Sequence, residues 1–178
     1  AKLDFGRKEG LTLALWLKPD ADNPRDVPLL SALNHLGSPA DAGFGAGREL
    51  RLIDGELELR LSNRFPAYAV IVRTEGAAIR PEQWRHVALT YAGGKNAAAV
   101  RFFVDGGEVA VRVLYDDLSG EPAKREFLVG ADNAQDGARW RGALDGVRSF
   151  PRALDSAAVR ARFAAGALPR ALGALDRS

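Results

Sequence analysis

The chain has 178 residues and no cysteine, and its 25 basic and 23 acidic residues leave a net charge of +2. The missing cysteines exclude a disulfide scaffold, a thiolate metal site and a cysteine nucleophile. Charges of both signs alternate along the sequence, which argues against nucleic acid as a partner. No apolar stretch approaches the roughly 18 residues that a membrane-spanning helix needs, so no membrane insertion is expected.

Apolar residues recur mostly with a period of two, which is the spacing of half-buried β-strands. The expected strands are Leu11–Leu17, Glu49–Ile53, Glu56–Leu61, Ala69–Thr74, His86–Tyr91, Val100–Val104, Glu108–Leu114, Glu126–Gly130 and Gly142–Phe150. Turn residues separate them, and no helical pattern lies between them. The sequence therefore predicts an all-β protein, an antiparallel β-sandwich or barrel.

The segment RELRLIDGELELRL predicts a hairpin with a two-residue type I′ turn at Asp54-Gly55. Its register places leucines on one face and opposite charges on the other: Leu50 with Leu59, Leu52 with Leu57, Glu49 with Arg60 and Arg51 with Glu58. We interpret the charged side as an ion-paired surface face. A second hairpin is expected to turn at residues 105–107, with Phe102 and Phe103 on opposite faces.

One short C-terminal helix is expected in DSAAVRARFAAG, with Asp155 as its N-cap and Gly166 at its end. Val159 and Phe163 lie four residues apart and would face the sheet. The predicted organisation is one domain at residues 1–166 followed by a tail at residues 167–178.

Three acidic residues, Asp54, Glu56 and Glu58, alternate along one strand, a spacing that also occurs in sandwich-fold glycosidases. Asp54 is part of the turn, however, and an arginine faces Glu58. A guanidinium lowers the pKa of a carboxyl group, whereas a catalytic acid needs a raised one. We therefore predict no catalytic residue here.

The chain has two histidines, and neither lies in a metal-binding or triad motif. His86 begins a strand, where it is expected to be half-buried with its ring bonded to a backbone group. His35 lies in the polar, glycine-rich segment SALNHLGSPADAGFGAG, and loops carry function more often than strands do. Phosphate-binding loops, G-x-S-x-G and zincin motifs are all missing from the sequence.

Several segments in succession resemble a known family: LTLALWLKPD, EQWRHVALTYAGG, VRFFVDGGEV, LVGADN and WRGALDGVRSFPRALDSAAVRARF. Together they resemble laminin G-like (LamG) domains of the concanavalin A-like lectin/glucanase superfamily, which includes the pentraxins. The likeness runs from Leu11 to Phe163 and implies a jelly-roll β-sandwich. Gly146 departs from the family, which commonly has glutamate there.

A narrower likeness lies in GRELRLIDGELELRLSNRFPAYAVIVRT. This segment is similar to LamG-like domains inside large bacterial proteins that also carry c-type cytochrome domains. The resemblance implies an exported, periplasmic or cell-surface parent protein, with the export signal outside this chain.

Calcium is a ligand that this resemblance implies. The segment LVGADNAQDG is similar to a pentraxin calcium loop, in which Asp132, Asn133 and Asp136 would supply the oxygen ligands that calcium prefers. Ala134 stands where an acidic residue is expected, and the only candidate for a second acid–amide pair is DADN at residues 20–23. The alternative is a solvated turn whose Asp and Asn side chains bond their own backbone.

Carbohydrate is the ligand class that the resemblance implies most directly. The candidate contacts are Asn34, His35, Asn63, Arg64, Phe65, Tyr68 and Trp140. Trp140 lies between arginines and is expected to be more exposed than Trp16 and Trp84, which are assigned to the core. The alternative is that Trp140 and Phe65 cover an edge of the core.

These observations predict a non-catalytic binding module for a polysaccharide or other glycan. A structural or protein-interaction spacer that contacts neighbouring domains and binds no sugar is the alternative from another class. Glycoside hydrolase activity is the remote one. Fold likeness alone does not decide among them.

Overall fold

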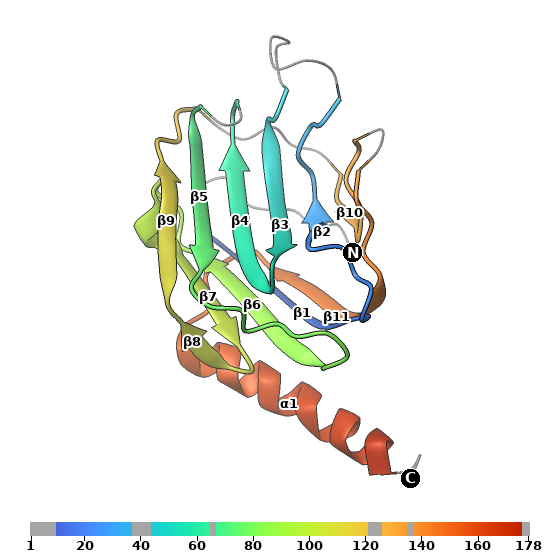
Figure 1. The fold of residues 1–178 in the computed structure, drawn as a ribbon. Helices are drawn as coiled ribbons and strands as arrows, with labels where there is room; N and C mark the ends of the chain where they lie inside the picture. Colours follow the sequence, from blue (N-terminus) through green and yellow to red (C-terminus); the bar gives the residue numbers. More distant parts are fainter. Residues whose placement is uncertain (1–9, 37–43, 65–66, 121–125, 135–136, 176–178) are drawn as a thin grey trace.

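The computed structural model describes residues 10–36, 44–64, 67–120, 126–134 and 137–175. Two antiparallel sheets pack face to face (Figure 1), which confirms the predicted β-sandwich. The five-stranded sheet has the order β11-β1-β6-β7-β8. Its strands are β11 (Gly142–Phe150), β1 (Leu11–Pro19), β6 (Arg85–Tyr91), β7 (Val100–Val104) and β8 (Gly107–Val109). A short 3-10 turn, η1 (Ala97–Ala99), precedes β7.

The six-stranded sheet has the order β10-β2-β3-β4-β5-β9. Its strands are β10 (Leu128–Val129), β2 (Asp26–Ser31), β3 (Gly47–Ile53), β4 (Glu56–Ser62), β5 (Ala69–Thr74) and β9 (Val111–Asp116). Leucines and valines of both sheets fill the space between them, among them Leu13, Leu50, Leu59 and Val70. Burial of these apolar side chains is the main favourable term in folding.

The first hairpin has the predicted register, with Leu50 opposite Leu59 and Glu49 opposite Arg60. Asp54 and Gly55 have φ values of 52° and 82°, the positive values of a type I′ turn. The second hairpin turns in the same way at Asp105 and Gly106, because Val104 already pairs with Gly107. Alternation then places Phe102 in the main core and Phe103 on the outer face.

Three features differ from the prediction. Strand β2 was not among the expected strands, and its Pro28 lies at a shift in the register with β3, where a strand tolerates proline. The expected strand Glu108–Leu114 is wrong as one unit: Ala110 separates β8 of one sheet from β9 of the other. The helix, α1 (Ser156–Leu175), continues past Gly166.

Helix α1 lies against the outer face of the five-stranded sheet (Figure 1), where Val159 packs with Ala14, Ala88 and Phe103. The Asp155 carboxylate accepts a hydrogen bond from the Ala158 amide, as expected of the N-cap. His86 is only 3% exposed, so it is buried rather than half-buried. Its ring contacts Trp16 and Phe163, with centroids 5.2 and 5.9 Å away. No helix in the described part of the chain is long and apolar enough to cross a membrane.

Candidate functional site

The outer face of the six-stranded sheet carries two rows of mostly polar and charged side chains, which we call the charged face. The strand register aligns Ser31, Glu49, Arg60, Ile71 and Tyr115 in one row, and Pro28, Arg51, Glu58, Arg73 and Arg112 in the next. The leucines between them point to the core, because successive residues of a strand alternate in direction. The alternation that directs the leucines into the core therefore also directs the charged side chains to the outer face.

The centre of the charged face is buried, which corrects the expected surface location, while Arg112 and Tyr115 at its edge are partly exposed. The side chain of Glu49 is 0% exposed and that of Glu58 is 1% exposed. Of the two register pairs of opposite charge, Glu49 and Arg60 do form an ion pair, at 3.4 Å, whereas Arg51 and Glu58 pair with other residues in the described part of the chain. Arg60 and Arg73 both contact Glu58, at 2.6 and 2.5 Å, while Arg51 contacts Asp26 at 2.8 Å.

Glu49 is the centre of this network. Its Oε1 lies 3.1 Å from a terminal nitrogen of Arg51, and its Oε2 lies 3.4 Å from one of Arg60. His35 reaches the same carboxylate from the loop after β2, with Nε2 3.1 Å from Oε1. A buried carboxylate is stable only when it is paired and hydrogen-bonded, and these contacts meet that condition.

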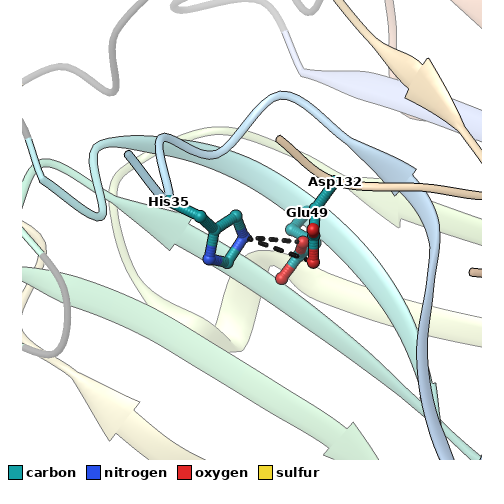
Figure 2. A group of neighbouring side chains, drawn as sticks. All are labelled: His35, Glu49 and Asp132. Atoms are coloured by element: carbon teal, nitrogen blue, oxygen red, sulfur yellow. Dashed lines mark hydrogen bonds and ion pairs between the residues drawn. The ribbon is translucent and has the colours of Figure 1, made fainter. Parts of the chain in front are cut away.

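Two loops about a hundred residues apart in sequence meet above Glu49. Figure 2 shows His35 and Asp132 converging on Glu49, with Nε2 of His35 3.9 Å from Oδ2 of Asp132. The backbone amide of His35 donates to Oδ1 of Asn133 at 2.8 Å, and the Asn133 amide donates to Asn34 at 3.4 Å. The predicted sugar contacts Asn34 and His35 and the predicted metal ligands Asp132 and Asn133 thus form one cluster.

The electrostatics of this cluster stabilise charged forms. Burial alone would raise the pKa of Glu49, but hydrogen bonds from His35 and Ser31 and the positive charge of Arg51 together lower it. Burial would likewise lower the pKa of Arg51, but Glu49 and Asp26 raise it. Glu49 is therefore held as a carboxylate and Arg51 as a guanidinium.

The same cluster brings together three candidate ligands for a cation. His35, Glu49 and Asp132 each offer one ligand atom, and these atoms lie within 4.8 Å of one another. However, one nitrogen of Arg51 lies 3.1 Å from Glu49 and 3.4 Å from Asp132, and its positive charge repels a metal. The other oxygen of Asp132 accepts from the Ala134 amide. The described donors do not fit calcium, and Asp136 lies outside the described residues.

The second acid–amide pair lies elsewhere, at Asp20 and Asn23. The Asn23 side chain accepts from the Arg141 amide at 2.8 Å, while the backbone amide of Asp20 donates to the Arg141 carbonyl at 3.0 Å. These contacts close a turn beside the start of β11. The pair does not join Asp132.

Asn63, Arg64 and Tyr68 lie on the loop between β4 and β5. Because Ser62 at the end of β4 pairs with Gly47 at the start of β3, this loop lies at the same end of the sheet as the loop between β2 and β3 (Figure 1), which carries His35. The Asn63 amide donates to the Tyr68 carbonyl at 3.1 Å, which closes the loop. Tyr68 is 45% exposed. Strands β3 and β5 are separated only by β4, so this loop lies about 10 Å from the His35 cluster. Phe65 lies outside the described residues.

The tryptophans differ from the prediction. Trp16 is buried as expected, but Trp84 is 39% exposed and does not belong to the core. Trp140 is less exposed than Trp84, and it packs against the main core. Its Nε1 is buried without a hydrogen-bond partner among the described residues. Trp140 therefore covers a core edge, which was the alternative interpretation.

Each member of the acidic triplet is paired with arginine. Asp54 pairs with Arg25 at 2.5 Å, Glu56 with Arg112, and Glu58 with Arg60 and Arg73. The hydrogen bond from Arg112 lowers the pKa of Glu56. The lowered pKa of Glu56 is the opposite of what a general acid needs.

Sequence reasoning missed Glu49 and Arg51 as site residues, although their strand was predicted. It also missed a pocket of about 260 Å³ beside the cluster, lined by Ser31, Ala32, Leu33, Glu126, Leu128 and Asn133. Tyr115, 40% exposed at the end of the Glu49 row, was missed as well. The alternation of charges on β3 and β4 was the available signal for Glu49 and Arg51.

The sequence profile of the concanavalin A-like lectin/glucanases superfamily matches residues 2–160. The chain belongs to this superfamily. No curated protein matches the sequence.

Solved structures with this fold include a carbohydrate-binding module of the Ruminococcus gnavus IT-sialidase, bound to α2,3-sialyllactose. It has a TM-score of 0.66 and 18% identity, over 88% of this chain and 84% of that chain. The binding domain of Paraclostridial Mosquitocidal Protein 1 has a TM-score of 0.63 and 18% identity, over 87% of this chain. The ligand-binding domain of botulinum neurotoxin serotype D, in complex with N-acetylneuraminic acid, has a TM-score of 0.63 and 14% identity, over 92%. This chain spans only 37% and 39% of the two toxin domains.

Proposed function

We propose that this superfamily member is a non-catalytic glycan-binding module. Its binding surface is the end of the six-stranded sheet that carries Asn34, His35, Asn133 and the 63–68 loop. The observation that carries the proposal is the convergence of Asn34, His35 and Asn133 above Glu49, beside the 260 Å³ pocket.

The chemistry of this surface suits sugars. Amide and imidazole groups both donate to and accept from hydroxyl groups, and the exposed ring of Tyr68 offers an apolar face for stacking. The contacts among His35, Asn133 and Glu49 hold these groups in place before a ligand arrives. Such preorganisation reduces the entropy lost on binding.

Binding without catalysis is supported by the state of the acidic groups. The pKa values of Glu49 and Glu56 are both lowered, and the other carboxylates of the charged face are paired with arginine. A glycosidase needs one carboxyl group that stays protonated near neutral pH. The likeness to sialic-acid-binding domains supports the same interpretation at the level of fold.

A glycan array tests the proposal, with sialylated and neutral polysaccharide fragments both included. Tyr68→Ala and Asn34→Ala are expected to weaken binding about tenfold each, the loss of one stacking contact or a few hydrogen bonds. Trp84→Ala is the matched control, because it removes an exposed aromatic ring at the opposite end of the sandwich. Binding of no glycan by the folded wild-type protein would reject the proposal.

A protein-interaction spacer is the second candidate, and strand β9 favours it. This edge strand exposes Val113, Leu114 and Tyr115 in succession, and an apolar edge strand can pair with another chain. A spacer would give an empty glycan array, and Leu114→Lys would abolish its binding to a neighbouring domain of the parent protein.

The proposed context is a larger exported bacterial protein, in the periplasm or at the cell surface, whose glycan or neighbouring domains are the partners. Calcium binding stays a prediction, and the positive charge of Arg51 beside Glu49 and Asp132 argues against it. Addition of calcium to chelator-treated protein is expected to leave the melting temperature unchanged, since a bound ion would raise it. If calcium raised the melting temperature of the wild-type protein but not that of Asp132→Asn, the ion would bind at this cluster and Arg51 would have to move away from it.

A further inference from the structure

A second pocket lies at the opposite end of the sandwich from His35, about 20 Å away along the seven residues of β3. Its volume is about 430 Å³, and we call it the proline pocket, since Pro19, Pro24 and Pro81 line it together with Leu52, Ala77 and Ile79. This volume is in the range of small-molecule sites. Arg25, Asp54 and Arg80 are its charged lining residues.

The proline pocket is built from segments tied together by their backbones. The Asp54 amide donates to the Arg25 carbonyl at 2.7 Å, the Ile79 amide to Gly55 at 3.1 Å, and the Glu82 amide to Pro19 at 2.7 Å. A Cβ on Gly55 would lie 2.8 Å from the Ile79 carbonyl, so only glycine permits this close approach. The pocket is therefore formed before any ligand binds.

The charge at its rim is positive. Arg25 donates to Asp54 at 2.5 Å, which balances those two charges. Arg80 is exposed and makes no ion pair with any residue in the described part of the chain. Its guanidinium is thus available beside an apolar lining, and guanidinium groups bind carboxylates with two parallel hydrogen bonds.

We propose that the proline pocket binds a small apolar carboxylate, with its hydrocarbon body against the prolines, Leu52 and Ile79 and its carboxylate on Arg80. This site is independent of the proposed glycan surface, because the two lie at opposite ends of β3. A neutral sugar lacks both features, since it has no charge and few apolar faces.

The test titrates three probes into isotope-labelled protein and follows backbone amide resonances. 2-Naphthoate has the body and the charge, 2-naphthalenemethanol has the body alone, and acetate has the charge alone. We expect 2-naphthoate to shift the resonances of residues 23–25, 54–55 and 77–80 saturably. The neutral alcohol is expected to bind about fivefold more weakly, and acetate not to bind.

Two variants and a control complete the experiment. Arg80→Gln should weaken 2-naphthoate binding about fivefold, and Ala77→Phe, at an exposed lining position, should abolish it by filling the pocket. Arg152→Gln removes an exposed arginine near the other end of β1 and should change nothing. Equal binding to wild type and Ala77→Phe, or equal binding of naphthoate and the alcohol, would overturn the proposal. Melting curves establish that each variant is folded.

Discussion

Nε2 of His35 lies 3.1 Å from Oε1 of Glu49, and this contact joins a surface loop to a carboxylate that solvent does not reach. Arg51 and Arg60 bind the same carboxylate from β3 and β4. Glu49 therefore couples the stability of the six-stranded sheet to the position of the proposed binding loop.

Glu49→Gln is expected to destabilise the protein by about 3 kcal/mol, because it leaves Arg51 and Arg60 buried without their shared counter-charge. Urea unfolding measures the change. Glu108→Gln is the matched control, since Glu108 pairs with Arg101 on an exposed edge and should cost less than about 1 kcal/mol. Equal losses in the two variants would contradict the central role of Glu49.

The lowered pKa of Glu49 also predicts a pH dependence. Above its ordinary value of 4.5 the carboxylate is ionised in both the folded and unfolded states, and its stabilisation is fully present. As pH falls below 4.5, the unfolded chain takes up the proton first, and this stabilisation is lost through the lower folded pKa. The free energy of unfolding should therefore fall as the pH drops below 4.5, and less steeply in Glu49→Gln. Parallel pH profiles of the two proteins would refute this assignment.

Much of this face was predictable, because the Asp-Gly turn and the alternating leucines define the register of β3 and β4. The contact of Glu49 with Arg60 follows from the register, but the partners of Arg51 were not predictable. Arg51 binds Asp26 and Asp132, and neither lies on the strand that faces it in the hairpin. The loops that bring Asp132 and His35 together are about a hundred residues apart, and no local pattern encodes their meeting. Strand β2 was missed as well. Its Pro28 lies where the pairing with β3 slips by one residue, so the strand does not show a regular pattern.

Gly47→Ala is expected to displace the loop that carries His35. Gly47 has a φ of 137°, and a Cβ there would lie 2.1 Å from the Ala32 carbonyl oxygen. The expected loss is more than about 2 kcal/mol, with weaker glycan binding. Gly76→Ala is the control, because Gly76 also has positive φ but no atom within 4 Å of the new Cβ, so strain alone should cost about 1 kcal/mol. Equal effects would show that loop packing plays no part.

Whether Gly166→Ala stabilises or destabilises the protein depends on whether α1 packs against Trp16 at this position. At an ordinary helix interior position, replacement of glycine by alanine stabilises by about 1 kcal/mol. In α1, however, a Cβ at Gly166 would lie 2.7 Å from Nε1 of Trp16. Gly166→Ala should therefore destabilise the protein in thermal melts, whereas Ala165→Gly, at an exposed position, should cost about 1 kcal/mol. A stabilised Gly166→Ala would show that the helix does not pack against Trp16.

The most direct test of the glycan-binding claim is a titration of isotope-labelled protein, followed by backbone amide resonances. The probes are α2,3-sialyllactose and the glycans that the array selects. The proposed surface predicts saturable shifts at residues 34, 35, 68 and 133, and no shifts at residues 54–55 and 79–80. Shifts confined to the proline pocket or to strand β9, or none with any glycan, would contradict the claim.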